Sequence, residues 1–260
     1  MKIHVLNKTD NELKFLIEDS NPQFANALRR IMISEVPILA IDSADFSTND
    51  SVLYNEVIVH RLGLIPLVFD PKKFHFKDEH EDGKTCSMCE VVFVISKKGP
   101  GMVYSKDMKS SDPDVKPLYD EIPIVELFDD QKLKLEASAS LGLAKNHARY
   151  QAAIAHYRYF PVAKLKGKLE NPEEVMKACP KNALKIDGEK VSVTLDCDLC
   201  KACVKIAKPK GLLETEGEDT KFIFNVETVS GLKPEEIVFS AVDILKGKVK
   251  DFGKEIRKLK

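Results

Sequence analysis

The stretch at residues 21–40, NPQFANALRRIMISEVPILA, decides how the beginning of this 260-residue chain folds. Asn21 is a good helix N-cap, and Pro22 suits the first helical position, where its missing N–H is not needed. Four apolar residues follow at the spacing of one helix face: Phe24, Ala27, Leu28 and Ile31. The stretch therefore predicts an amphipathic helix that ends at Pro37.

This predicted helix has more apolar surface than one stripe, because Met32, Ile33 and Val36 extend it. An ordinary core helix beside a sheet would explain that surface. The alternative is a helix that packs both on its own domain and on a partner subunit. Arg29 and Arg30 on the same helix could bind a carboxylate of a partner or form a solvated face. The helix alone does not decide between these alternatives.

The segments that flank the helix predict a small α+β unit. Residues 2–7 and 12–18 alternate in the manner of strands, with the polar turn NKTDN between them. Residues 38–46 predict another strand after the helix. The opening of the chain therefore predicts a β-β-α-β unit with the apolar helix on one face.

The middle of the chain predicts a second, β-rich domain. Residues 90–95 and 132–141 have the apolar pattern of strands. The apolar run at 54–69 is interrupted by glycine and proline, so no long regular element is expected there. Repeated Gly, Pro, Ser and Asp between 97 and 123 predict loops. We expect this domain to cover residues 44–150.

A third unit is expected at residues 165–218. Asn171, Pro172 and the acidic residues that follow them predict the start of a helix. Farther along, Asp187 and Gly188 between two apolar runs predict the turn of a β-hairpin.

The end of the chain predicts a strand and then a long helix. Strands are expected at 157–162 and 221–229, and Pro234 opens the terminal helix. Its apolar stripe has near-heptad spacing and runs through Val238, Ala241, Leu245, Phe252 and Leu259. A stripe of this length predicts a helix that packs along much of its surface.

The totals of the sequence exclude several classes of protein. Lys and Arg number 40 and Asp and Glu 41, a formal net charge of −1. A dedicated nucleic-acid binder usually has a basic excess, so no direct sequence-specific binding of nucleic acid is expected. No apolar run approaches the roughly 20 residues of a membrane span, and the first residues lack a signal-peptide core. We expect a cytoplasmic protein without the common catalytic motifs.

The most specific chemical signal is Cys197-x2-Cys200-x2-Cys203, with Cys179 directly before Pro180 upstream. Bacterial ferredoxins hold iron–sulfur clusters with such a run and a Cys-Pro. Zinc sites more often pair two C-x2-C turns, and disulfides are less expected in an unexported chain. We expect one iron–sulfur cluster, with zinc or a disulfide as alternatives. It would be [4Fe–4S] if Cys179 binds and [3Fe–4S] if three cysteines bind.

A single cluster favours a structural or sensing role, because an electron on it would have no second site within the chain. A second group, Cys86 and Cys89, follows His75 and His80. These four residues could form a Cys2His2 zinc site, although their spacing is irregular. Two free thiols or a labile disulfide are the alternatives.

Several stretches, taken in order along the chain, resemble one family. They are NALRRIMISEVPILAID, YNEVIVHRLGLIPL, SKDMKSSDPDVKP with DEIPIVEL, and LGLAKNHARYQAA. Together they are similar to the α-like subunits of cellular RNA polymerases, and most of all to the archaeal D subunits. That family is related to bacterial α and to the third-largest eukaryotic subunit. The resemblance spans nearly the whole chain.

The resemblance implies an α+β fold with a discontinuous dimerisation domain. This domain would combine residues 1–43, 151–164 and 219–260. An inserted β-rich domain would occupy 44–150, and a ferredoxin-like domain with the iron–sulfur cluster would occupy 165–218. The eukaryotic relatives hold zinc in the middle domain with four cysteines, whereas this chain has only two there.

The resemblance also implies a role and a set of partners. The chain would be a non-catalytic subunit that dimerises with a small α-like partner, subunit L. Small subunits N and P would assist assembly of the large subunits, which would carry catalysis of nucleotidyl transfer. The partner surfaces would include Phe24, Leu28, Arg29, Arg30, Ile31, Leu245 and Phe252.

The cysteines by themselves support an alternative function. A single-cluster, ferredoxin-like electron-transfer protein would need the cysteine loop and a solvent-exposed cluster that cycles with a redox partner. It would not need the long apolar terminal helix.

Overall fold

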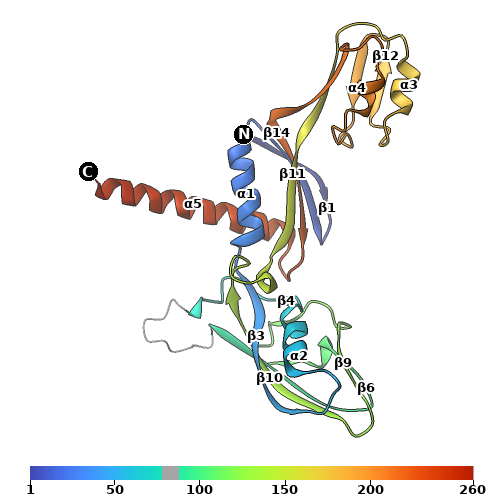
Figure 1. Cartoon of the computed structure of the whole chain (residues 1–260). Coiled ribbons are helices and arrows are strands. Elements are labelled where there is room, and N and C mark those ends of the chain that lie inside the picture. Colours follow the sequence, from blue (N-terminus) through green and yellow to red (C-terminus); the bar gives the residue numbers. More distant parts are fainter. Residues whose placement is uncertain (78–87, 260) are drawn as a thin grey trace. The chain divides into compact units, whose positions relative to one another are not determined.

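Segments that are distant in the sequence come together in two units of the chain (Figure 1). The computed structural model describes residues 1–77 and 88–259. The first unit consists of Met1–Lys8, Leu13–Ala27 and His156–Asn225. The second consists of Thr9–Glu12, Leu28–Ala155 and Val226–Lys260. Helices and strands occur in both, so the predicted α+β class is confirmed.

The first unit contains a four-stranded sheet in the order β1-β2-β14-β11. The strands are β1 Lys2–Lys8, β2 Glu12–Glu18, β14 Leu213–Thr228 and β11 Ala153–Leu165. Strands β1 and β2 pair antiparallel, as their alternating pattern predicts. The buried rings of Phe15 and Phe224 stack with centroids 5.1 Å apart and bind β2 to β14.

Strands β11 and β14 are longer than predicted, and the segment between them in sequence lies beyond one end of both (Figure 1). That segment contains α3 Pro172–Lys177, β12 Leu184–Asp187, β13 Lys190–Val193 and α4 Ala202–Ile206. The helix start after Asn171 and the hairpin are both confirmed. The turn falls one residue later than predicted, because Asp187 already pairs with Lys190 and Gly188 has a φ of 58°.

Helix α1, Pro22–Ser34, begins as the sequence predicts. The side-chain Oδ1 of Asn21 accepts a hydrogen bond from the N–H of Phe24 at 2.8 Å. This bond satisfies one of the amide groups that a helix leaves unpaired at its first turn. Leu28 and Ile31 are buried within the chain itself.

The second unit contains another four-stranded sheet, in the order β3-β10-β5-β7. The strands are β3 Ile38–Asn49, β10 Lys132–Gly142, β5 Glu90–Lys98 and β7 Lys109–Ser110. Strand β10 pairs antiparallel with both β3 and β5. Its inward residues are Leu133, Leu135, Ala137 and Ala139, all of them fully buried. The predicted strands of this region are therefore confirmed.

No long regular element forms in residues 54–69, as expected, and one other expectation for this unit is wrong. Residues 54–69 contain a short helix, α2 Asn55–Gly63, which ends at Gly63. Its β-branched residues favour strands locally, but burial of Ile58 and Leu62 on one helix face outweighs that preference.

The region 97–123 is not only loops. It contains β6 Gly101–Tyr104, the 3-10 turn η2 Ser105–Asp107, β7 and β8 Lys116–Pro117, and β9 Pro123–Leu127 begins at its end. Strand β6 pairs with β9, and β8 pairs with the short β4, Leu67–Val68. Frequent turn residues hid these strands, because each strand is only two to five residues long.

Helix α5, Pro234–Lys258, ends the described chain (Figure 1, red). The hydroxyl of Thr228 donates to the carbonyl oxygen of Leu232 at 2.7 Å and fixes the turn before the helix. In the same turn, a Cβ on Gly231 would lie 1.9 Å from the carbonyl oxygen of Leu67, so only glycine fits there. No helix among the described residues is both long and apolar enough to cross a membrane.

Replacing Asn21 with Ala removes the cap of α1. We expect Asn21→Ala to lower the free energy of unfolding by about 1 kcal/mol, because the N–H of Phe24 would lose its side-chain partner. Urea unfolding followed by circular dichroism measures the change. Gln23→Ala, at an exposed position of the same turn, is the control and should change stability little. Equal stability of both variants would contradict the capping role.

Candidate functional sites: a cysteine cavity, a polar network and an exposed helix face

The cysteine loop of the first unit has an unusual backbone. Cys197 and Cys200 follow β13, and Cys203 lies in α4. Leu199 and Lys201, on either side of Cys200, have φ angles of 59° and 61°. Residues that alternate between left- and right-handed conformations turn successive N–H groups toward one side and form a concave anion site, as at many iron–sulfur centres.

Strands β11 and β14 hold this loop in place. Arg158 of β11 donates a hydrogen bond to the carbonyl oxygen of Leu195. A Cβ on Gly217 of β14 would lie 2.4 Å from the Cβ of Tyr159 and 3.3 Å from Leu199. The glycine therefore lets the loop and β11 approach β14 closely.

The structure brings all four predicted cysteines to one small cavity. Cys179, Cys197, Cys200 and Cys203 line it, and the other lining residues are Leu184, Val193, Asp198, Lys201 and Thr215. All four are free thiols, and they range from buried Cys203 to exposed Cys200. The N–H of Ala183 donates to the Sγ of Cys179 at 3.3 Å. A sulfur that already accepts an N–H is typical of a metal thiolate site.

The electrostatics of the cavity disfavour a bare thiolate. Burial raises the pKa of the Cys203 thiol, and the proximity of Cys179 and Cys197 adds to the rise. A thiol in this state loses its proton when a metal cation binds the sulfur.

The four cysteines of the cavity are the donor type that iron–sulfur clusters use. Among the described residues, no three His, Cys, Asp or Glu side chains are close enough together to hold one metal ion. A cluster has several irons, so its four thiolates are spread over a wider space than the ligands of one ion. Thr215, whose buried Oγ1 has no hydrogen-bond partner in the described chain, also lines this cavity.

The second cysteine pair is only partly described. Cys89 is fully buried immediately before β5. Cys86 and His80 lie outside the described residues. The predicted zinc site therefore stays a prediction.

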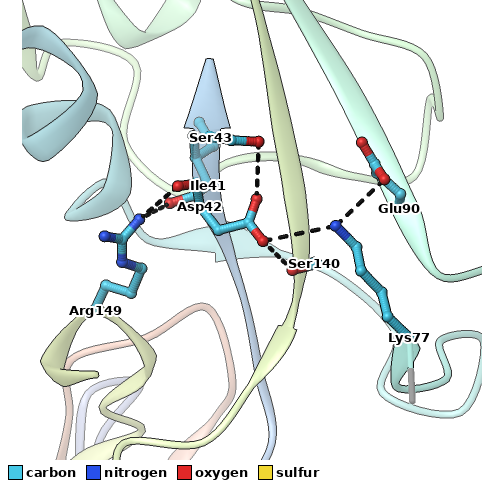
Figure 2. Close-up of polar contacts among 7 residues, drawn as sticks. All are labelled: Ile41, Asp42, Ser43, Lys77, Glu90, Ser140 and Arg149. Atoms are coloured by element: carbon cyan, nitrogen blue, oxygen red, sulfur yellow. Dashed lines mark hydrogen bonds and ion pairs between the residues drawn. The ribbon is translucent and has the colours of Figure 1, made fainter. Parts of the chain in front are cut away.

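A polar network around Asp42 lies in the second unit, and the sequence reasoning gave it no role (Figure 2). The hydroxyl of Ser140 on β10 donates to the Asp42 carboxylate on β3 at 2.7 Å. The Nζ of Lys77 lies 3.6 Å from the same carboxylate and 3.3 Å from that of Glu90. Burial lowers the pKa of Lys77, but the two carboxylates outweigh it and the pKa lies above its usual value.

Arg149, in the 3-10 turn η3 Ala148–Tyr150, completes this network from the other side of β3 (Figure 2). Its Nη1 donates to the carbonyl oxygens of Ile41 at 2.9 Å and Asp42 at 3.1 Å. The network therefore connects Lys77 and the turn after β10 to strand β3. It is a structural connection, because its polar groups are paired with one another.

The predicted partner residues fall into three classes of burial. Leu28 and Ile31 are 2% and 4% exposed, Phe24, Arg29 and Leu245 are half-buried, and Arg30 is exposed. Phe252 is 68% exposed. Four exposed apolar residues share one face of the second half of α5, with spacings of three, four and three: Val249, Phe252, Ile256 and Leu259. We call them the α5 stripe.

Charged pairs accompany the α5 stripe. Lys254 lies 2.8 Å from Asp251, and Lys258 lies 2.6 Å from Glu255. Exposed pairs of this kind contribute little to stability, and they keep the rest of the helix surface in water. A contiguous apolar face beside a polar one is typical of a protein–protein contact.

The sequence of the chain is similar to a family model and to several known proteins. Residues 39–162 match the family model described as the RNA polymerase Rpb3/RpoA insert domain. The middle of the chain is thus an insert domain of the RNA polymerase type, and it contains β3, α2, β10 and the Asp42 network.

Relatives extend this likeness along the chain. The "DNA-directed RNA polymerase subunit Rpo3" of Methanothermobacter thermautotrophicus is 39% identical over 95% of this chain and 96% of its own length. Proteins of the same name from Methanosphaera stadtmanae and Thermococcus kodakarensis are each 37% identical, over 95% and 100% of this chain and 96% and 99% of their own.

The chain belongs to the family of DNA-directed RNA polymerase subunit Rpo3. The resemblance seen in the sequence is confirmed. Likeness over nearly the whole chain to polymerase subunits does not favour a single-cluster electron carrier.

Removing the Ser140 hydroxyl tests the Asp42 network. We expect Ser140→Ala to lower the free energy of unfolding by about 1.5 kcal/mol, because a buried hydrogen bond to a charged group is lost. Urea unfolding measures the change. Ser138→Ala, on the same strand and outside the network, is the matched control. A loss of equal size in both variants would show that the bond to Asp42 contributes nothing of its own.

Proposed function

We propose that this protein is a non-catalytic assembly subunit of a DNA-directed RNA polymerase. It dimerises with a small α-like partner, subunit L, and the pair forms the platform on which the large catalytic subunits assemble. Family membership supports this proposal, and the α5 stripe is the observation in the structure that carries it.

The physical case for dimerisation rests on what the α5 stripe leaves in water. Full burial of one Val, Leu, Ile or Phe side chain contributes about 1.5–3 kcal/mol. Phe252 at 68% and Leu259 at 86% exposed keep most of that energy available for a partner. An apolar helix face that receives a second helix would release it. Subunit L is the partner that the resemblance supplies.

The other predicted partner residues take different roles in this proposal. Leu28 and Ile31 hold α1 from beneath, since they are buried. Phe24 and Leu245 are half-buried at the proposed dimer surface, and exposed Arg30, with Arg29 beside it, faces the large subunits. Subunits N and P join the same assembly.

We further propose a division of labour along the chain. Residues 1–43, 151–164 and 219–260 form the dimerisation domain, 44–150 the inserted domain, and 165–218 a ferredoxin-like domain. Nucleotidyl transfer and its catalytic residues belong to other subunits. The chain makes no sequence-specific contact with nucleic acid, in keeping with its net charge of −1, and it works in the cytoplasm with its polymerase.

We propose that the cysteine cavity holds one iron–sulfur cluster on Cys179, Cys197, Cys200 and Cys203. When bound, the cluster cross-links these four positions. The cavity, the nest-like backbone and the N–H bond to Cys179 support this assignment. The core around it is small, namely Leu169, Val175, Leu184, Cys203, Ala207 and Leu213. A core of that size gains much from a metal staple.

Changing the α5 stripe tests the assembly function. We expect Phe252→Asp to reduce recovery of the small partner and the large subunits about tenfold or more, because a charge replaces a central apolar anchor. Anaerobic affinity purification of the tagged full chain, with mass identification of what accompanies it, measures recovery. Circular dichroism should show an unchanged fold.

Phe128→Asp is the matched control, since it makes the same change at an exposed phenylalanine away from α5. It should leave the small partner bound. Wild-type chain recovered alone, or with a reductase, would overturn the assembly function and support the electron-transfer alternative.

Changing one cysteine tests the structural role of the cluster. We expect Cys197→Ser to unfold residues 165–218 and leave the rest of the chain folded, because the staple is lost. Limited trypsin digestion with mass analysis locates the new cleavage sites, and iron and sulfide are counted on the same sample. Ser192→Ala, at an exposed position of β13, is the control. Unchanged resistance of the 165–218 segment would sink the idea.

A further inference from the structure

Thr215 is a buried polar residue whose hydroxyl makes no hydrogen bond within the described chain. Its side chain is 3% exposed. Within the described chain its Oγ1 has no hydrogen-bond partner, and this includes the four cysteine sulfurs. The residue lines the same cavity as those cysteines. Buried hydroxyls are nearly always paired, so this one requires an explanation.

The position of Thr215 on β14 would suit an apolar residue. Leu213 and Thr215 are buried, while Glu214 is half-buried and Glu216 exposed. Side chains of a strand alternate between faces, so Leu213 and Thr215 share the inward face. Leu213 belongs to the small apolar core around Cys203. Valine has the shape of threonine and would fill this place without an unpaired hydroxyl. Packing therefore does not account for the threonine.

We propose that the Thr215 hydroxyl donates a hydrogen bond to a sulfur of the iron–sulfur cluster, either a bridging sulfide or a cysteine thiolate. This inference rests on the cluster assigned under the proposed function. A thiolate or sulfide is an anionic acceptor, and hydrogen bonds to charged groups are the strong ones. Thr215 lines the same cavity as the four cysteines, and its buried Oγ1 has no other partner in the described chain.

The chemical consequence is a shift in the reduction potential of the cluster. Hydrogen bonds to the sulfurs are among the factors that set this potential. A donor stabilises the more negative, reduced cluster more than the oxidised one, so it raises the potential. Thr215 is thus a tuning residue and takes no part in electron transfer itself.

The experiment compares Thr215→Val with Thr215→Ser in the full-length chain. Valine keeps the shape and removes the donor, whereas serine keeps the donor. Thr220→Val is the matched control, because Thr220 is exposed on the same strand and its hydroxyl is bonded to Glu218. Each protein is reconstituted anaerobically with iron and sulfide, and the potential is measured by redox titration.

We expect the potential of Thr215→Val to be more negative than that of the wild type. The shift should reach up to about tenfold in the equilibrium constant of reduction, which is about 59 mV for one electron. Thr215→Ser and Thr220→Val should keep the wild-type potential.

Resonance Raman spectra of the oxidised cluster in H2O and D2O give a second readout that needs no reduction. The iron–sulfur stretches should shift less on deuteration in Thr215→Val than in the wild type. Equal potentials and equal deuterium shifts in the two loaded proteins would overturn the inference. If Thr215→Val does not fold, Thr215→Ala is compared with Thr215→Ser by the same criteria.

The two proposals fail in different ways. If the wild type takes up no iron and sulfide, the cluster assignment is wrong and this inference falls with it. If the wild type loads normally and Thr215→Val is indistinguishable from it, only the role of Thr215 is wrong.

Discussion

Burial of apolar side chains away from water stabilises a protein. The apolar side chains on one face of the second half of α5 are not buried by any of the described residues. Val249, Phe252, Ile256 and Leu259 lie on one helix face and remain exposed. The helix is nevertheless firmly positioned at its start, where Gly231 lies against the backbone of Leu67 and Thr228 fixes the turn. A helix that is held at its start and exposes an apolar face gains free energy when a partner covers that face. This is the constraint from which the assembly role follows.

The inserted domain and the segment with the four cysteines differ in the interactions that stabilise them. The inserted domain has a wide apolar core under β10 and a paired polar network at Asp42. The segment with the four cysteines has a core of only six buried residues. An apolar core of that size offsets little of the chain entropy that is lost on folding. A metal cluster that joins four distant positions would supply the missing constraint, and its presence would couple the fold of this segment to metal supply.

Thr215 shows how far such a site can extend beyond its ligands. Strand β14 crosses from the first sheet to the cysteine cavity, so one continuous strand carries both Phe224 of the sheet core and Thr215 at the cavity. Partners outside the first shell of a metal site orient the ligands and adjust their electronic properties. In the proposed cluster site, a hydroxyl at this point would connect the properties of the cluster to the strand that also supports the sheet.

The sequence by itself determined the features that depend on few neighbouring residues. The Asn21 cap, the alternation of β10 and the hairpin at Gly188 follow from local dihedral preferences and from side-chain periodicity. The spacing of the cysteines predicts an iron–sulfur site, and this stays a prediction. Only the tertiary structure decided which apolar residues are covered, so that Ile31 is buried and Phe252 is not. It also decided that residues 55–63 form a helix and that Arg149 donates a hydrogen bond to Ile41. In the same way, it placed Thr215 at the cavity that the four cysteines line. The physical reason is that these contacts join residues far apart in the chain, and local propensity carries no information about such meetings.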